Sequence, residues 1–116
     1  MAIKVDNIKA QMRKGILEYC ILSIISRGDS YASAIISELK AAEMIVVEGT
    51  LYPILYRLED DGLIEAVWQQ ETGRAAPRKI YSATEKGREE NERRLGLWAG
   101  FRTAVDHFCG EDAGHE

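Results

Sequence analysis

The feature that most constrains this fold is a segment that, as a helix, would be apolar on nearly every side. Residues 12–26 favour a helix, and their apolar residues point to nearly every side of a helical wheel: Ile16, Leu17, Tyr19, Cys20, Ile21, Leu22, Ile24 and Ile25. A helix that is apolar all round must be covered all round. Because the core of a 116-residue chain covers one face, we expect a partner subunit to cover the other. Residues 1–12 are expected to form a polar arm, and Asp29 or Ser30 to cap the next helix.

Two further helices are predicted from apolar residues at helical spacing. The first spans residues 31–42, and the second spans residues 49–61 and is closed by Gly62. Pro53 is tolerated in the first turn of a helix, where backbone N–H groups lack partners anyway. This places the start of the second helix close to Gly49.

The second half of the chain predicts a β-hairpin and one long helix. Residues 63–70 and 78–82 are compatible with strands, and the turn-rich segment 71–77 separates them. Thr84 can cap a final helix over residues 85–108. Its first half is highly charged, and its second half carries an apolar seam at spacings of three and four: Leu95, Trp98, Phe101, Val105 and Phe108.

The net charge of −4 does not exclude nucleic acid, since the excess of acid is confined to one end. The last eleven residues contain four acids and no Lys or Arg, which leaves 15 acids and 15 bases in residues 1–105. Residues 73–79 depart from neutrality, with Arg74, Arg78 and Lys79 and no acid. Such a loop is typical of a phosphate contact. The alternative is an ordinary solvated turn.

Motifs for catalysis, cofactors and metals are missing from the sequence. It contains neither of the glycine-rich patterns that cradle phosphates in nucleotide sites. Its histidines, His107 and His115, lie in or near the acidic end, and no Cys or His spacing suits zinc. We therefore expect no enzyme, no cofactor and no metal site.

The sequence also predicts a cytoplasmic protein. Its two cysteines are far apart and do not form a disulfide framework, which favours a reducing compartment. No apolar run approaches the ~20 residues of a membrane span. The first residues lack the apolar core of a signal peptide.

The order helix, helix, helix, strand, basic loop, strand is that of a winged helix-turn-helix. In this arrangement the third helix has a free outer side that fits the major groove of DNA, and the hairpin reaches the neighbouring backbone. The outer side is expected to carry Tyr52, Tyr56 and Arg57, whose polar atoms can bond phosphates or base edges. Two alternatives stay open. Arg57 can pair with Asp61, one helical turn further on, and Tyr52 can support the hairpin.

A longer motif makes the resemblance specific. Residues 48–64 read EGTLYPILYRLEDDGLI, and Gly28-Asp29-Ser30-Tyr31, Trp68, Pro77-Arg78-Lys79-x-Tyr81 and Thr84-x-x-Gly87 stand in order around them. This set resembles the PadR family, the phenolic-acid-response type of bacterial repressor. The resemblance covers about residues 13–109. It implies a homodimeric transcription factor, usually a repressor, whose C-terminal helix makes much of the dimer interface.

The fold class predicted is thus mainly α with a small β-hairpin, a winged helix-turn-helix plus a C-terminal dimerisation helix. We divide the chain into a DNA-binding domain with its N-terminal arm (1–83), a dimerisation helix (84–109) and an acidic disordered tail (110–116). The partners expected are double-stranded DNA, a second copy of the chain and a small aromatic effector, with no membrane. The alternative is a winged-helix protein-interaction module, or an anti-regulator, without specific DNA binding.

Three sets of residues carry these expectations. The DNA-binding set is Tyr31, Thr50, Tyr52, Tyr56, Arg57, Arg74, Arg78 and Lys79. The dimer set is Ile16, Tyr19, Cys20, Leu95, Trp98, Phe101, Val105 and Phe108. A single C-terminal helix is similar to the small subtype that includes lactococcal multidrug-response regulators, in which a Trp of the last helix lines a drug pore at the dimer centre. The resemblance implies a ligand set of Tyr19, Ser23 and Trp98. Trp98 either packs the dimer or forms an aromatic ligand platform.

Overall fold

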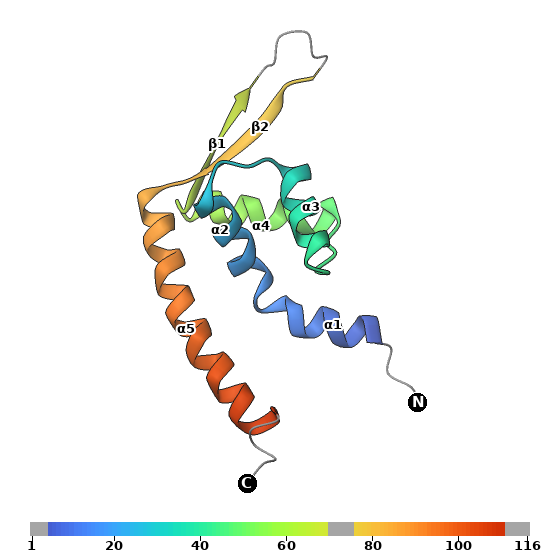
Figure 1. Ribbon diagram of the computed structural model, residues 1–116. Coiled ribbons are helices and arrows are strands. Elements are labelled where there is room, and N and C mark those ends of the chain that lie inside the picture. Colours follow the sequence, from blue (N-terminus) through green and yellow to red (C-terminus); the bar gives the residue numbers. More distant parts are fainter. Residues whose placement is uncertain (1–4, 70–75, 111–116) are drawn as a thin grey trace.

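The computed structural model describes residues 5–69 and 76–110. These residues form, in order, α1 (Val5–Lys14), α2 (Leu17–Arg27), α3 (Ala32–Ala41), α4 (Glu48–Asp60), β1 (Ile64–Gln69), β2 (Arg78–Ala83) and α5 (Glu85–Cys109). The two strands pair antiparallel as a hairpin that stands away from the helices, whereas α1 and the second half of α5 extend from the opposite side (Figure 1). The predicted order of three helices, a hairpin and a long last helix is confirmed, with one additional helix at the start.

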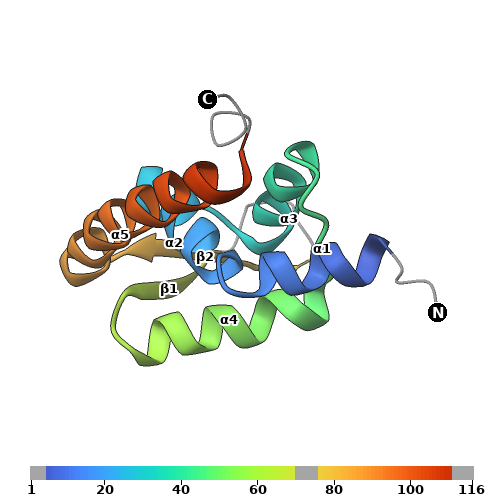
Figure 2. The same ribbon diagram turned by 90° about the horizontal axis from the view of Figure 1, so that it is seen from below.

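The core is built around α2, which lies between α5 and α4 (Figure 2). Its inner residues are almost completely buried, and they meet the apolar stripes of α3 and α4 and the base of the hairpin: Leu17, Ile21, Leu22, Ile24, Ile25, Ile35, Leu39, Leu51, Ile54, Leu55, Leu58, Leu63, Ile64 and Tyr81. The outer side of α2 is partly covered by α5 of the same chain, and both Tyr19 and Cys20 are half-buried. The chain therefore supplies part of the cover that the sequence led us to expect from a partner.

The start of the chain differs from the expectation. The predicted polar arm contains α1, and the helix predicted over residues 12–26 begins at Leu17. The break falls at Gly15 and Ile16, where the Ile16 N–H donates to the carbonyl of Arg13 at 3.0 Å in a tight turn. Glycine favours such a break because it loses more backbone entropy in a helix than other residues.

The expected cap of α3 is also wrong. The residue at the N-cap position is Tyr31, whose side chain makes no capping bond. Ser30 is buried and pairs with β2 instead: its N–H donates to the Tyr81 carbonyl at 3.0 Å, and its carbonyl accepts from the Tyr81 N–H at 2.7 Å. This bridge ties the turn before α3 to the hairpin.

Helix α4 starts one residue before Gly49 but accommodates Pro53 differently from the prediction. Pro53 is the sixth residue of the helix, beyond the first turn. Since proline has no N–H, the carbonyl of Gly49 lacks its helical donor. Gly49 is exposed, so water can satisfy that carbonyl. At the other end Gly62 adopts a φ of 77°, and the Leu63 N–H bonds the Leu58 carbonyl at 2.9 Å, which closes the helix as predicted.

The junction between the hairpin and α5 is tightly built. The register pairs Ile64 with Ala83 and Trp68 with Lys79. The Thr84 side chain accepts a hydrogen bond from the Gly87 N–H at 2.9 Å, which confirms the predicted cap. Gly87 itself packs on the carbonyl of Leu63, where a Cβ would collide with backbone.

Candidate nucleic-acid interface

One side of α4 and the hairpin enclose a hollow of about 500 Å³. Tyr52 and Tyr56 line it from α4, Tyr31 lines it from the start of α3, and Arg78 and Lys79 line it from β2. The exposed fractions of Tyr52 and Tyr56 are 37% and 61%. Five of the eight residues predicted to bind DNA are therefore gathered around one concave surface. The alternative role of Tyr52 as a support for the hairpin is compatible with this position.

The cations of the hairpin base are held against aromatic rings. The guanidinium carbon of Arg78 lies 4.1 Å from the centroid of the Tyr31 ring. The Lys79 ammonium lies 5.7 Å from each of three ring centroids, those of Tyr56, Trp68 and Tyr81. At these distances a cation is attracted to the face of a ring. The side chains of Arg78 and Lys79 are thus positioned by packing against rings. Arg74, the third predicted cation, lies outside the described residues.

Tyr81 forms the floor of this cluster. Its side chain is 2% exposed, and burial raises its pKa to about 12, with smaller contributions from the charges that Tyr52, Glu59 and Tyr56 can carry. The Tyr81 phenol is therefore neutral over the physiological range. A neutral phenol adds no negative charge beneath the cations of the hairpin base.

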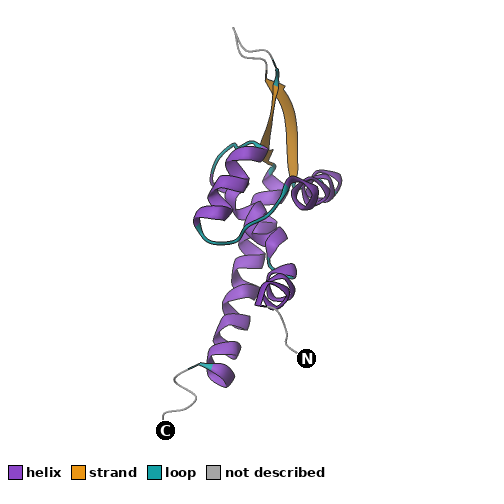
Figure 3. Ribbon diagram, turned by 90° about the vertical axis from the view of Figure 1, so that its right-hand side faces the viewer, coloured by secondary structure: helices purple, strands orange, loops and turns teal. Residues whose placement is uncertain are grey.

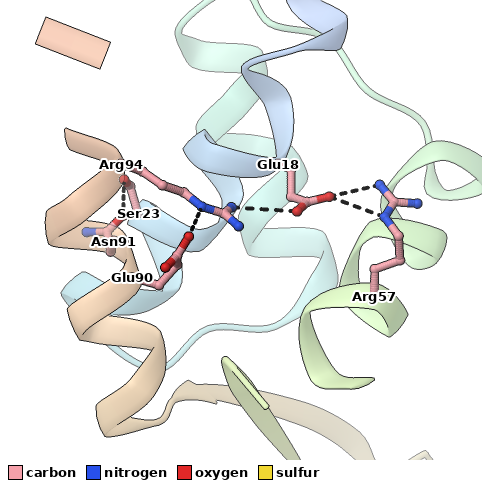
Figure 4. A network of polar contacts seen from close by, with 6 residues as sticks. All are labelled: Glu18, Ser23, Arg57, Glu90, Asn91 and Arg94. Atoms are coloured by element: carbon pink, nitrogen blue, oxygen red, sulfur yellow. Dashed lines mark hydrogen bonds and ion pairs between the residues drawn. The ribbon is translucent and has the colours of Figure 1, made fainter. Parts of the chain in front are cut away.

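Arg57 and Thr50 lie on a different side of α4. They line a second, larger groove of about 900 Å³ between α1, α2, α4 and α5. The Arg57 Nε and Nη2 atoms both donate to Oε1 of Glu18, at 3.2 and 3.0 Å (Figure 4). The expected alternative partner, Asp61, is wrong, because the carboxylate that binds Arg57 comes from α2. The Arg57 guanidinium thus turns toward α2, although Arg57 also lines a smaller hollow together with Tyr56 and Lys79.

The larger groove brings together two of the three residues of the predicted ligand set. Tyr19 and Trp98 both line it, next to Leu97 and Phe101. Ser23 does not, since its hydroxyl donates to Oδ1 of Asn91 on α5 at 2.7 Å. The groove therefore has an aromatic wall built by α2 and α5, without the serine.

The second half of α5 presents an apolar stripe to solvent. It extends beyond the helical body, at the end of the molecule opposite the hairpin (Figure 3). The exposed fractions of its large apolar side chains are 52% for Leu95, 60% for Leu97, 67% for Phe101, 56% for Val105 and 77% for Phe108. The sequence prediction missed Leu97, although its distance of four residues from Phe101 is a helical spacing that marks the same stripe.

The rest of the predicted dimer set is less exposed. Ile16, Tyr19 and Trp98 are half-buried and line the groove. Cys20 packs against the core, and burial raises the pKa of its thiol, so it is a poor nucleophile. The longest run of exposed large apolar side chains lies on α5, and Ile8 and Met12 of α1 are also exposed.

Two classes of site do not arise from the described part of the chain. Within residues 5–69 and 76–110, no three His, Cys, Asp or Glu side chains are grouped to hold a metal ion. Among the described helices, none combines the length and apolar character that a membrane span requires.

A helix-turn-helix whose last helix lies beside a cationic antiparallel hairpin is the architecture of winged-helix DNA-binding proteins. A family model described as "Transcriptional regulator PadR-like family" matches residues 21–93. The chain belongs to this family of DNA-binding transcriptional regulators, which confirms the resemblance and the predicted fold class.

Solved structures agree with this assignment. A PadR-like transcription factor from Bacteroides fragilis is 45% identical, with 89% of this chain and 99% of that chain covered and a TM-score of 0.73. A PadR-like regulator from Bacillus cereus is 35% identical, with coverages of 84% and 95% and a TM-score of 0.74. A PadR family regulator from Eggerthella lenta is 26% identical, with coverages of 92% and 93% and a TM-score of 0.80. Among curated proteins, no significant match was found.

Proposed function

We propose that this protein is a homodimeric repressor that binds a pseudo-palindromic operator. The observation that carries the proposal is the concave surface where Tyr52 and Tyr56 of α4 stand beside Arg78 and Lys79 of β2. An α-helix fits the major groove, where side chains reach base edges, while cations beside it hold the phosphates. Repression itself rests on the resemblance, since the family's members are usually repressors.

The charge distribution limits how this surface binds. The described body of the protein has no large excess of positive charge, so non-specific attraction to DNA is weak. Affinity for the operator then depends on contacts from α4 and on the simultaneous engagement of two subunits. Two identical helices in a twofold dimer read half-sites separated by about one helical turn.

Dimerisation is proposed through α5. Its apolar stripe, from Leu95 to Phe108, is more than half exposed at every large apolar residue but Trp98. A stripe of this kind at spacings of three and four packs well against a second helix. A second copy of the chain would bury it together with the groove-lining residues Tyr19 and Trp98.

A small aromatic effector is the remaining part of the proposal. Tyr19 and Trp98 line the groove, and aromatic side chains bind planar ligands by stacking. The test is quenching of Trp98 fluorescence by a library of aromatic compounds, in a Trp68→Phe background that removes the second indole. Calorimetry on the Trp98→Ala variant then decides, because a ligand that binds it with unchanged affinity contradicts the platform role.

The repressor proposal is tested by titrating the protein with the DNA upstream of its own coding sequence and with unrelated DNA of equal length. We expect at least about a 10³-fold preference for the upstream DNA at physiological salt. Equal affinity for both fragments contradicts the proposal and favours a winged-helix module that binds protein. Transcription from the upstream promoter in vitro, with and without the protein, then distinguishes a repressor from an activator.

A further inference from the structure

Glu18 occupies the centre of an ion network that joins three helices. Its Oε1 atom accepts both hydrogen bonds from Arg57 of α4. Its Oε2 atom lies 3.6 Å from Nη1 of Arg94 on α5. Figure 4 shows the Glu18 carboxylate between the two guanidinium groups, with one oxygen turned to each. A single side chain of α2 therefore connects the helix that faces the hairpin to the helix that carries the apolar stripe.

On α5, a second carboxylate holds Arg94 in place. The Nε atom of Arg94 donates to Oε2 of Glu90 at 2.9 Å, and Nη1 of Arg93 lies 3.5 Å from the other Glu90 oxygen. The side chains of Glu18, Glu90 and Arg94 are only 28%, 24% and 26% exposed. Networks of partly buried charges hold geometry better than isolated surface pairs. The orientation of Arg94 toward Glu18 is thus fixed by a second carboxylate.

The network also forms part of the larger groove. Glu18, Arg57 and Arg94 line it together with Tyr19 and Trp98. A rotation or shift of α5 that widens or narrows the groove must move Arg94 relative to Glu18. Because both Glu18 oxygens belong to one carboxylate, this movement also changes how that carboxylate binds Arg57.

We propose that Glu18 is a positioning residue for DNA recognition, which couples the placement of α4 to that of α5. The inference rests on the proposed function, in which α4 reads DNA and α5 joins the subunits. Its physical basis is one carboxylate with two guanidinium partners on two helices. Coupling between sites needs such a shared element, whose state both sites bias.

The test is a double-mutant cycle on DNA affinity with Arg57→Gln and Arg94→Gln, repeated in the Glu18→Gln background. The probe is a duplex that the wild-type protein selects from a random pool, with unrelated DNA for comparison. The measured quantity is the ratio of the two affinities, with thermal unfolding followed in parallel. Arg27→Gln is the matched control, because Arg27 pairs with Glu38 at 2.9 Å on the surface, with side chains 68% and 50% exposed.

We expect Arg57→Gln and Arg94→Gln each to lower the affinity ratio by about three- to tenfold. The variant with both substitutions should lower the ratio by no more than the larger of these two factors. In the Glu18→Gln background neither arginine substitution lowers the ratio further, and Arg27→Gln leaves it within about twofold. A direct contact of Arg57 with DNA would add the same factor whatever stands at position 94, so it cannot produce this non-additivity.

Three other results have distinct meanings. If the two losses multiply in the double variant, and do so equally in the Glu18→Gln background, the coupling role of Glu18 is overturned while the DNA-binding function stands. If the wild-type protein selects no duplex from the pool, the proposed function fails and the inference fails with it. A fall in unfolding temperature with unchanged affinity ratios assigns Glu18 a structural role alone and also overturns the inference.

Discussion

Phe101 provides the sharpest test of the proposed dimer. Its side chain is 67% exposed in a single chain, in the middle of the apolar stripe of α5. Aromatic side chains bury about 150–250 Å² when fully covered, so a dimer can bury about 120 Å² of accessible area on each Phe101. At ~25 cal/mol per Å² this corresponds to about 3 kcal/mol per copy, or about 6 kcal/mol for the two copies of a symmetric dimer. Because unfolded and monomeric states already bury part of this area, we expect about half of this free energy, which weakens dimerisation by about 150-fold.

The assay is sedimentation equilibrium of the Phe101→Ser variant over a range of concentrations. We expect a wild-type dimer and a largely monomeric variant, with a circular dichroism spectrum of similar helix content. The unfolding temperature of the wild type should rise with concentration, whereas that of the variant should not. Ile45→Ser is the matched control, since Ile45 is 60% exposed on the connection between α3 and α4. A variant that dimerises as tightly as the wild type would refute the proposed role of the stripe.

Three further predictions concern the hairpin and its junctions. Lys79→Ala should weaken binding to operator DNA and to unrelated DNA by the same factor. It should also reduce the slope of log affinity against log salt concentration by about 1 per subunit, and an unchanged slope would count against a phosphate contact. Gly87→Ala should lower the free energy of unfolding, measured in urea, by at least about 3 kcal/mol because its Cβ would collide with the Leu63 carbonyl. Gly100→Ala, where the Cβ meets open space, is the control and should stabilise the protein by up to about 1 kcal/mol. An unchanged urea midpoint for Gly87→Ala would contradict the packing. Because the folded pKa of Tyr81 is raised from 10.0 to about 12, its contribution to stability is intact below pH 10 and is lost as pH rises toward 12. Tyr81→Phe should flatten that alkaline loss in chemical denaturation, and an identical loss in both proteins would disprove the assignment.

Local patterns in the sequence predicted much of the fold. The apolar stripe of α4 and its closure at Gly62 follow from helical spacing and from the left-handed conformation that glycine adopts easily. The cap of α5 by Thr84 is equally local, because the hydroxyl and the Gly87 N–H are three residues apart. Features decided within one or two turns of the chain were therefore accessible without a structure.

The errors arise where distant segments meet. The partner of Arg57 is Glu18, 39 residues away, so spacing along α4 could only suggest the nearby Asp61. Ser30 is used by a bridge to Tyr81 rather than as a cap, which depends on where the hairpin folds back. Pro53 sits past the first turn, where the exposure of Gly49 lets water bond the unpaired carbonyl, and the sequence does not specify that exposure. By contrast, the break before α2 had a local signal in Gly15.

Five of the eight residues named for DNA binding line one hollow, whereas Thr50 and Arg57 line another groove. Helical spacing alone placed Tyr52, Tyr56 and Arg57 on one outer side. In the structure the hairpin lies beside both tyrosines, whereas the Arg57 guanidinium binds Glu18 of α2. The aromatic surroundings of Lys79 require three elements to converge, so sequence reasoning identified the cation without its rings. Tertiary packing, rather than residue type, decides which side chains of α4 can work together.

Hydrogen exchange with and without a selected DNA duplex shows whether α4 and the hairpin form the DNA-reading surface. We expect slower exchange on DNA binding in peptides covering residues 48–60 and 76–83, with the smallest changes in the distal part of α5. Protection confined to α1 and α5, with α4 and the hairpin unchanged, would contradict it.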